Sequence, residues 1–155
     1  MGGMRIELPG RQPIVLEELV LDFTGTLSKD GELIAGVDQR LTDLSRRIHV
    51  TVLTADTFGT ARAVLAGLPL QVTIVRTGKD KADYVNDRGP DRVVAIGNGR
   101  NDGPMCGAAA LSIAIVGPEG AASELIREAD VVVGDIRDGL DLLQNPMRLT
   151  ATLRD

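Results

Sequence analysis

The chain has almost no aromatic residues: among its 155 residues there are two phenylalanines, one tyrosine and no tryptophan. Proteins that stack nucleic-acid bases do so on aromatic side chains, so the composition argues against such a surface. The formal net charge is −5 at pH 7, and a basic surface is the other mark of proteins that bind nucleic acids or anionic membranes. We therefore expect neither a nucleic-acid partner nor a membrane partner.

Cysteine and long apolar runs are also scarce. The single cysteine, Cys106, has no partner for an internal disulfide, which favours a reducing compartment. The longest nearly apolar run, Cys106 to Pro118, is too short to span a bilayer, and the N-terminus lacks an apolar stretch of signal-peptide length. The sequence therefore predicts a soluble, cytoplasmic protein, with one domain over residues 1–155.

What the sequence does contain is an alternation of short apolar runs with helical patterns. Strands that are apolar on both faces and joined by helices are typical of a parallel sheet that is covered on both sides. We therefore expect a Rossmann-like α/β/α fold of three layers with a mostly parallel sheet. The expected strands are Glu18–Asp22, Val50–Thr54, Gln71–Val75, Arg92–Ile96, Leu111–Val116 and Val131–Val133, and the expected helices are Asp38–Ile48, Thr57–Ala66, Asp80–Arg88, Asn101–Ala109 and Ala121–Ala129.

Three segments lie outside this alternation. Met4–Leu8 and Pro13–Leu16, separated by Pro-Gly-Arg-Gln, predict a small N-terminal β-hairpin. Ser28–Gly36 contains a Lys-Asp-Gly turn, which favours a short β-flap over a helix. The tail from Asn145 comes after an apolar helix and is expected to form a strap over its own domain, with packing on a neighbouring subunit as the alternative.

Polar residues occur where three of the expected strands end. Asp22 closes the first apolar run before a Thr-Gly-Thr sequence, Thr54 and Asp56 come after the second, and a Gly-rich turn from Asn98 to Asp102 comes after the fourth. The carboxyl ends of parallel strands meet at one edge of a sheet, so these side chains are expected to converge. A carboxylate nucleophile, a hydroxyl and acids that hold Mg²⁺ suit phosphoryl transfer.

A lysine completes this chemistry, and each residue also has a plain structural interpretation. Lys79 or Lys81, near the start of the helix before the fourth strand, can offset negative charge at that edge. Equally, Lys81 can be a solvated residue at a helix start, Thr54 can simply continue its strand, and Asn98-Gly99 can be a tight turn. Cys106, in a segment of small residues, is expected to be packed core.

In this order, the motifs resemble those of the haloacid dehalogenase (HAD) superfamily of phosphotransferases. Within it they are most similar to the phosphorylation domain of P-type ATPases, without any membrane part. DFTGTL resembles the D-K-T-G-T-L of that group, LTAD its T-G-D, and GNGRND its G-D-G-x-N-D. The stretch LSIAIVGPEGAASELIREADVVV resembles the strand, helix and strand that come after the last of these motifs in that group. The resemblance therefore covers about Leu19 to Ile136.

The resemblance implies a role for each residue of the predicted site. Asp22 would be the nucleophile that forms an aspartyl-phosphate, and Thr24 would offer its backbone carbonyl to Mg²⁺. Thr54 and Lys81 would bind the phosphoryl group, with Lys79 as the second candidate for the lysine. The remaining implied roles are Thr26 in shaping the turn, Asn101 at the phosphate, Asn98 and Asp102 at the metal, and Asp56 close to both.

Two positions depart from the superfamily pattern. Most of its phosphatases have an aspartate where this chain has Thr24, and general acid–base help of that kind is worth about 10²–10⁴-fold in rate. We therefore expect the phosphoenzyme to form and then to hydrolyse slowly, unless Asp56 or a partner protein activates water. Asn98 stands where the pumps have an aspartate, and the lost charge predicts weaker Mg²⁺ binding.

The spacing of the motifs leaves no room for a cap domain of ordinary size. Only about thirty residues separate Asp22 from Thr54, and Thr54 from Lys81. Together with the resemblance, this implies a capless, Mg²⁺-dependent phosphomonoester hydrolase. Its site would be open to a small phosphorylated molecule or a phosphorylated macromolecule, or covered by a neighbour in a homo-oligomer. The alternatives are a catalytically weak regulatory or phosphate-binding module of the same fold, and a protein that needs a partner for dephosphorylation.

Overall fold

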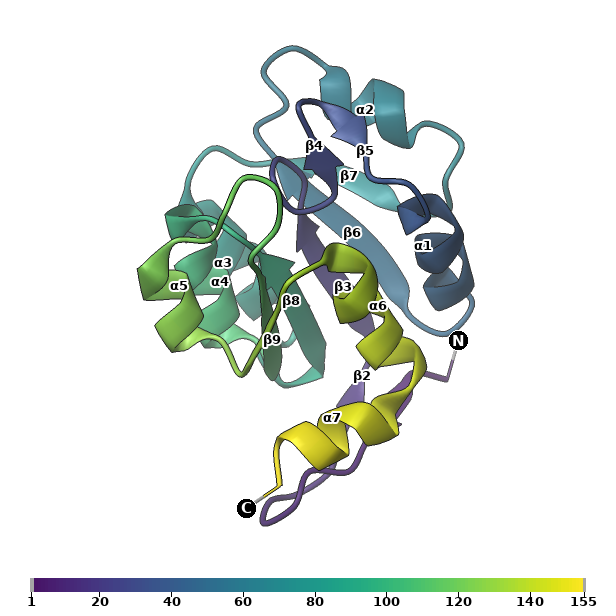
Figure 1. The fold of residues 1–155 in the computed structure, drawn as a ribbon, viewed down its shortest axis with the longest axis vertical. Helices are drawn as coiled ribbons and strands as arrows, with labels where there is room; N and C mark the ends of the chain where they lie inside the picture. The colour runs from purple at the N-terminus through teal and green to yellow at the C-terminus, as the bar shows by residue number, and fades with distance from the viewer. Residues whose placement is uncertain (1, 155) are drawn as a thin grey trace.

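The fold is built on a six-stranded sheet in the order β10-β9-β8-β3-β6-β7, in which every neighbouring pair is parallel (Figure 1). The computed structural model describes residues 2–154. The parallel α/β sheet predicted from the sequence is therefore confirmed. The strands are β3 (Glu18–Asp22), β6 (His49–Thr54), β7 (Gln71–Ile74), β8 (Val93–Gly97), β9 (Leu111–Ile115) and β10 (Val131–Val133).

Helices cover both faces of this sheet, which gives the predicted three layers. Alternate residues of β3 serve opposite faces: Leu19 and Leu21 pack in one hydrophobic cluster, and Val20 packs in the other. The first cluster includes side chains of α1 (Val37–Ser45), α2 (Thr60–Leu65) and α6 (Ile136–Gln144). The second includes side chains of α3 (Gly78–Arg88), α4 (Gly103–Ala108) and α5 (Ser123–Glu128), and it contains Cys106, as predicted.

Most helices begin or end inside the predicted ranges, for local reasons. The segment predicted as Thr57–Ala66 becomes helical only at Thr60, because Asp56 and Gly59 adopt left-handed backbone angles with φ of 45° and 72°. The segment predicted as Asn101–Ala109 divides into a 3₁₀ turn, Arg100–Asp102, and α4. A second 3₁₀ turn, Pro90–Arg92, precedes β8.

Both predicted hairpins are present, and the tail is more regular than expected. Strands β1 (Met4–Ile6) and β2 (Ile14–Leu16) pair antiparallel, as do β4 (Ser28–Lys29) and β5 (Glu32–Leu33), which form the flap. The tail forms a helix, α7 (Pro146–Thr152), whose Thr150 hydroxyl donates to the carbonyl oxygen of Glu7 at 2.6 Å. The strap is therefore helical and packs on the N-terminal hairpin of its own chain (Figure 1).

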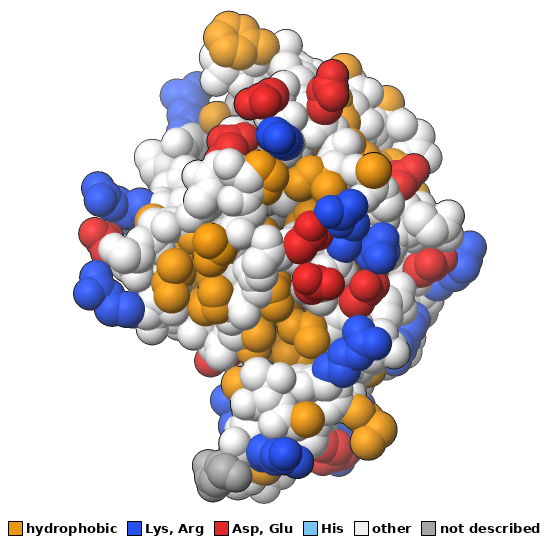
Figure 2. Space-filling view, viewed as in Figure 1, with side chains coloured by type: hydrophobic (Ala, Val, Ile, Leu, Met, Phe, Trp, Pro, Cys, Tyr) orange, Lys and Arg blue, Asp and Glu red, His pale blue; other side chains and the backbone are white. Residues whose placement is uncertain are grey.

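The surface that carries α1 and α6 mixes charges of both signs (Figure 2). Arg40 of α1 pairs with Asp141 of α6 at 2.9 Å, and Arg137 pairs with Asp135 at 2.6 Å. These ion pairs join the two helices on this side of the sheet and fix the start of α6. Within residues 2–154, no helix is long and apolar enough to cross a membrane.

The order of the strands creates a crevice at one place. The chain runs outward from β3 through β6 to β7, and then returns to β8 on the other side of β3. The connections after β3 and β8 therefore leave the sheet in opposite directions. In open α/β sheets, ligands bind at such a reversal of strand order, beyond the carboxyl ends of the strands.

Candidate active site

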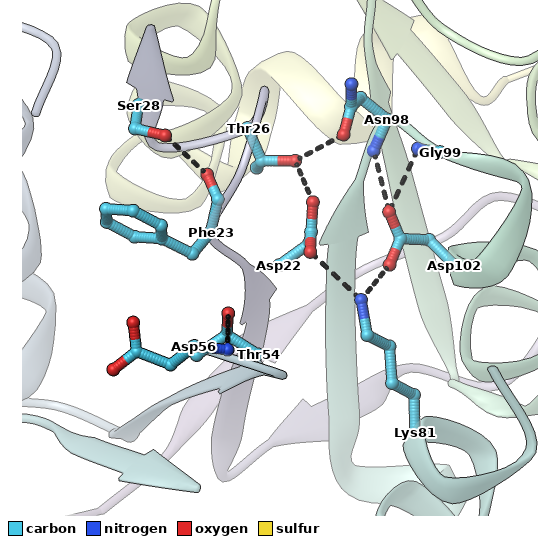
Figure 3. A network of polar contacts seen from close by, with 10 residues as sticks. All are labelled: Asp22, Phe23, Thr26, Ser28, Thr54, Asp56, Lys81, Asn98, Gly99 and Asp102. Carbon is cyan, nitrogen blue, oxygen red and sulfur yellow. Dashed lines mark hydrogen bonds and ion pairs between the residues drawn. The ribbon is translucent and has the colours of Figure 1, made fainter. Parts of the chain in front are cut away.

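Asp22 is the last residue of β3 and lies at this reversal, with its side chain 12% exposed. Its Oδ1 accepts a hydrogen bond from Lys81 Nζ at 2.9 Å, and its Oδ2 accepts one from Thr26 Oγ1 at 3.1 Å (Figure 3). Both carboxylate oxygens are thus held in place by buried partners. The side chain is fixed at the edge of the sheet where a ligand can reach it.

The start of helix α3 decides which lysine reaches Asp22. Thr77 and Asp80 form a capping box, in which each side chain accepts a hydrogen bond from the other residue's backbone N–H. With the helix fixed in this way, Lys81 is buried against Asp22, whereas the Lys79 side chain is 82% exposed and pairs with Asp83 at 2.8 Å. The structure therefore brings Lys81, and not Lys79, to the site.

Asp102 is the second carboxylate that binds the Lys81 ammonium group. Its Oδ1 accepts a hydrogen bond from Lys81 Nζ at 2.7 Å, and its Oδ2 accepts from the backbone N–H groups of Asn98 and Gly99, both at 3.0 Å. The side chain is completely buried. A side chain at Gly97 would collide with this carboxylate, so the glycine is required there. Asp22, Lys81 and Asp102 form a continuous acid–lysine–acid bridge.

The charges of the bridge are strongly coupled. Burial, followed by the negative charge of Asp102, raises the pKa of Asp22 to about 6, although Lys81 and Thr26 act in the opposite direction. Burial alone would lower the pKa of Lys81, but the two carboxylates outweigh that effect and raise it. The lysine is therefore a permanent cation, and it neutralises only one of its two acids.

Thr26 and Asn98 bring a second oxygen next to Asp22. The completely buried hydroxyl of Thr26 lies 3.1 Å from Asp22 Oδ2 and 3.2 Å from Asn98 Oδ1, and its one hydrogen can be given to either. Asn98 Nδ2 donates to the carbonyl oxygen of Gly120 at 3.1 Å. Gly25 has a φ of 77°, and a Cβ there would lie 2.5 Å from Asn98 Nδ2. Sequence reasoning gave Thr26 only a role in the turn and had no signal for Gly120.

Thr54 and Asp56 form another side of the site, where β6 ends. Thr54 Oγ1 accepts from the backbone N–H of Asp56 at 3.2 Å, which leaves the hydroxyl hydrogen available to a ligand. The Asp56 carboxylate accepts from the backbone N–H groups of Ala61 and Arg62 at 2.7 and 3.2 Å. It therefore caps the start of α2, and Figure 3 shows it directed away from Lys81.

These residues surround a pocket of about 540 Å³. Thr24 and Asn101, both exposed, line it together with Asp22, Thr54 and Lys81. The flap contributes Gly31, which lies close to Thr60 of α2, so part of the pocket is bounded from above by the chain itself. Two further lining residues, Phe58 and Arg76, were not predicted from the sequence.

The oxygen atoms beside Asp22 are suited to Mg²⁺. A carboxylate oxygen of Asp22 and the amide oxygen of Asn98 lie 3.1 and 3.2 Å from the same Thr26 hydroxyl, and Thr24 lines the pocket beside them. Mg²⁺ prefers such hard oxygen ligands and keeps several waters, so a small set of protein ligands is sufficient. Asp102 is engaged by Lys81 and two N–H groups, and the described residues contain no group of three His, Cys, Asp or Glu side chains that could hold a metal.

Solved structures with the same architecture include HAD-family hydrolases and phosphatases. The cobalt-bound deoxy-D-mannose-octulosonate 8-phosphate phosphatase of Haemophilus influenzae has a TM-score of 0.71 at 15% identity, with 88% of this chain and 92% of that chain covered. The corresponding enzyme of Moraxella catarrhalis, in complex with magnesium, phosphate and KDO, has a TM-score of 0.71 at 13% identity, with 88% and 90% covered. A Streptomyces avermitilis protein assigned to the HAD family of hydrolases has a TM-score of 0.70 at 17% identity, with 89% and 87% covered. The likeness shows a HAD-like fold, while the resemblance to the P-type ATPase branch stays a prediction.

Comparison of the sequence with curated proteins finds relatives that match part of the chain. No family model matches the chain. Uncharacterized protein MJ0072 of Methanocaldococcus jannaschii is 44% identical over 39 residues, which are 25% of this chain and 89% of that protein. Uncharacterized protein MJ0073 of the same organism is 52% identical over 64 residues, which are 41% of this chain and 69% of that protein. The chain thus belongs to the same family as MJ0073 and has the fold of the HAD hydrolases.

Proposed function

We propose that the protein is a Mg²⁺-dependent phosphatase that hydrolyses a phosphomonoester through an aspartyl-phosphate on Asp22. The observation that carries this proposal is the bridge from Asp22 through Lys81 to Asp102, placed at the reversal of strand order and facing a pocket. The phosphatases with the same fold support it, because one of them was solved with magnesium and phosphate bound.

The first step forms a bond between a carboxylate oxygen of Asp22 and phosphorus. The bond from phosphorus to the ester oxygen breaks, and the leaving alkoxide takes a proton from solvent. Thr54 can donate its hydroxyl hydrogen to a phosphoryl oxygen, and the Lys81 ammonium offsets the negative charge that accumulates beside Asp22. Mg²⁺, held by Asp22, Asn98 and the carbonyl of Thr24, would supply further charge neutralisation when bound.

The second step needs a water molecule that attacks phosphorus and releases Asp22. A base that removes a proton from this water accelerates the step, and Thr24 cannot act as one at neutral pH. Asp56, the other candidate for this role, has its carboxylate committed to the start of α2. We therefore propose slow turnover, and Asp56→Asn should leave the rate of dephosphorylation unchanged.

The lack of a base at Thr24 and the engaged carboxylate of Asp56 also support a second candidate function. A protein that forms the phosphoenzyme but lacks a base would act as a catalytically weak regulatory module, or would depend on a partner that supplies the base. The bounded pocket of about 540 Å³ favours a small phosphorylated molecule as the ligand in either case.

The test is hydrolysis of an aryl phosphate with Mg²⁺ by the wild type and by Asp22→Asn, which keeps the size of the side chain. Acid quenching and then mass spectrometry detects the phosphoenzyme. The wild type should release phosphate and carry one phosphoryl group, and the variant should do neither. If the wild type and Asp22→Asn behave alike, the phosphatase proposal is wrong. If the phosphoenzyme forms but does not release phosphate, the second candidate function is favoured.

A further inference from the structure

The pocket extends well beyond the atoms that would bind the transferred phosphate. Its volume is typical of sites that hold a whole small molecule, for which about 300–1,000 Å³ is usual. The bridge and Thr54 occupy one side of it. Arg76, Phe58 and the flap residue Gly31 line other parts, so the remainder of a substrate would lie among them.

The charged side chains that line the pocket differ in whether they already have partners. Lys81 is shared between Asp22 and Asp102, and Asp56 accepts two backbone hydrogen bonds from α2. For Arg76, only the backbone N–H is engaged, by Asp80 Oδ2 at 2.9 Å. Within residues 2–154, the Arg76 guanidinium forms no ion pair. Of the cations that line the pocket, it is the one available to a ligand.

The position of Arg76 separates it from the transferred phosphate. It lies just after β7, and β7 is two strands away from β3, which carries Asp22. Neighbouring strands lie about 4.8 Å apart, so the ends of β3 and β7 are about 10 Å apart across the sheet. Val75, directly after β7, donates its backbone N–H to the carbonyl oxygen of Thr54, the last residue of β6, at 3.1 Å, which anchors the neighbouring Arg76 on the pocket wall.

We propose that Arg76 binds a second anionic group, a carboxylate or another phosphate, on the part of the substrate that is not transferred. The inference rests on the proposed function of the site and names its substrate class: a phosphomonoester that carries a further negative charge. The guanidinium group presents several N–H donors in a planar fork that matches carboxylate and phosphate oxygens. The apolar side chains of Phe58 and Val75 line the same pocket, so an aryl group is a suitable spacer between the two anions in a probe.

The test compares phenyl phosphate with 4-carboxyphenyl phosphate in the wild type, Arg76→Gln and Arg62→Gln. Arg62 is a matched control, because it is an exposed arginine of α2 whose side chain does not line the pocket. The wild type and the control should prefer the carboxylated substrate in kcat/KM by about tenfold or more, as expected for a hydrogen-bonded charge. Arg76→Gln should lose this preference and keep its activity on phenyl phosphate. An unchanged preference, or an equal loss on both substrates, would overturn the proposal, and the equal loss would place Arg76 at the transferred phosphate.

Binding of two non-hydrolysable analogues, benzylphosphonate and 4-carboxybenzylphosphonate, separates this proposal from the phosphatase itself. Calorimetry is carried out with Mg²⁺ present on the same three proteins. If neither aryl phosphate is hydrolysed, the phosphatase proposal fails, but selective binding of the carboxylated analogue that is lost in Arg76→Gln still supports the anion site. Equal binding of the two analogues to the wild type, or no binding of either, overturns it.

Discussion

Thr24 is exposed in the pocket, two residues beyond Asp22, at the position where an acid–base group would be expected. Thr24→Asp should therefore accelerate release of phosphate from the phosphoenzyme by about 10²-fold, at the low end of what general acid–base help supplies. Single-turnover decay of the phosphoenzyme measures this step directly. Thr24→Asn is the control, because it has nearly the same shape as aspartate and cannot take a proton. If both variants decay at the wild-type rate, the absence of a base at residue 24 is not what limits turnover.

Asn98 is the second residue that departs from the superfamily pattern, and a substitution can return the aspartate found there in the pumps. Asn98→Asp adds a negative charge beside Asp22, so Mg²⁺ should bind about tenfold more tightly, measured by calorimetry. The same change places a carboxylate where Nδ2 now donates to the carbonyl oxygen of Gly120, and the free energy of unfolding without metal should fall by about 1–3 kcal/mol. A variant with unchanged Mg²⁺ affinity would contradict the assignment of Asn98 as a metal ligand.

At this scale, the sequence predicts which residues meet but not how each side chain is directed. Asp22, Lys81 and Asp102 were predicted together because strand ends and a helix start determine where they lie. Asp56 was also predicted near them, but its left-handed backbone angle turns the carboxylate toward α2 instead. The resemblance favours Lys81 over Lys79, and the capping box of Thr77 and Asp80 is the local feature that fixes the start of α3 and so places Lys81 beside Asp22.

Helix α3 is attached to strand β3 at two points along its length. Lys81 reaches Asp22 at the carboxyl end of the strand, while Tyr84 and Arg88 reach the buried carboxylate of Glu18 at the other end, at 2.7 and 2.6 Å. Thr51 of β6 donates to the same carboxylate at 2.8 Å. The second attachment fixes the helix antiparallel to the strand, and so it orients Lys81 toward the site.

Tyr84→Phe removes one hydrogen bond to this buried carboxylate and keeps the ring. The free energy of unfolding should fall by about 1.5–3 kcal/mol, the range for hydrogen bonds to charged groups. Urea denaturation measures it. Lys79→Met, on the same helix, removes an ion pair whose lysine is 82% exposed and should change stability by less than about 1 kcal/mol. If the free energy of unfolding falls equally in the two variants, the hydrogen bond from Tyr84 to Glu18 stabilises the protein no more than an exposed ion pair does.

Strands were predicted more closely than helices for a physical reason. A buried parallel strand is apolar on both faces and ends where polar residues begin, so Glu18–Asp22 and Val131–Val133 have the predicted bounds. A short helix begins where the backbone angles allow it, and the positive φ of Gly59 delays α2 by three residues relative to Thr57. Neither composition nor periodicity encodes that angle.

The stability of the whole molecule should depend on the charge of Asp22. Its pKa rises from the ordinary value of 3.8 to about 6 on folding, mainly through burial and the nearby Asp102. Well below pH 3.8 the carboxyl is protonated in both the folded and the unfolded state. Between pH 3.8 and 6 only the unfolded chain loses the proton, so metal-free stability falls as the pH rises, by about 3 kcal/mol in total at most.

Asp22→Asn removes this penalty. In EDTA at pH 8 the variant should melt several degrees above the wild type, because each kcal/mol is worth about 2–4 °C for a chain of this size. The difference should disappear near pH 3.8, and added Mg²⁺ should raise the melting temperature of the wild type alone. A variant that is less stable than the wild type at pH 8 in EDTA would show that Lys81 stabilises the charged form more than burial destabilises it.

At the same scale, the layers and the parallel sheet were predictable from the alternation of strands and helices, but the shape of the site was not. The pocket depends on the flap approaching Thr60 and on Arg76 lying at the end of an outer strand. These are contacts between segments far apart in the sequence, and no local pattern specifies them.

The flap also offers a place for the fold to grow. Its turn, Asp30-Gly31, has φ of 53° and 83°, which is the geometry of a two-residue hairpin that leaves the sheet undisturbed. Insertions are tolerated best at such turns, and this one projects from the segment directly after Asp22. A longer segment at this turn would build new walls above the carboxylate without altering how the carboxylate is held. Selectivity in this fold can therefore evolve, or be engineered, separately from reactivity.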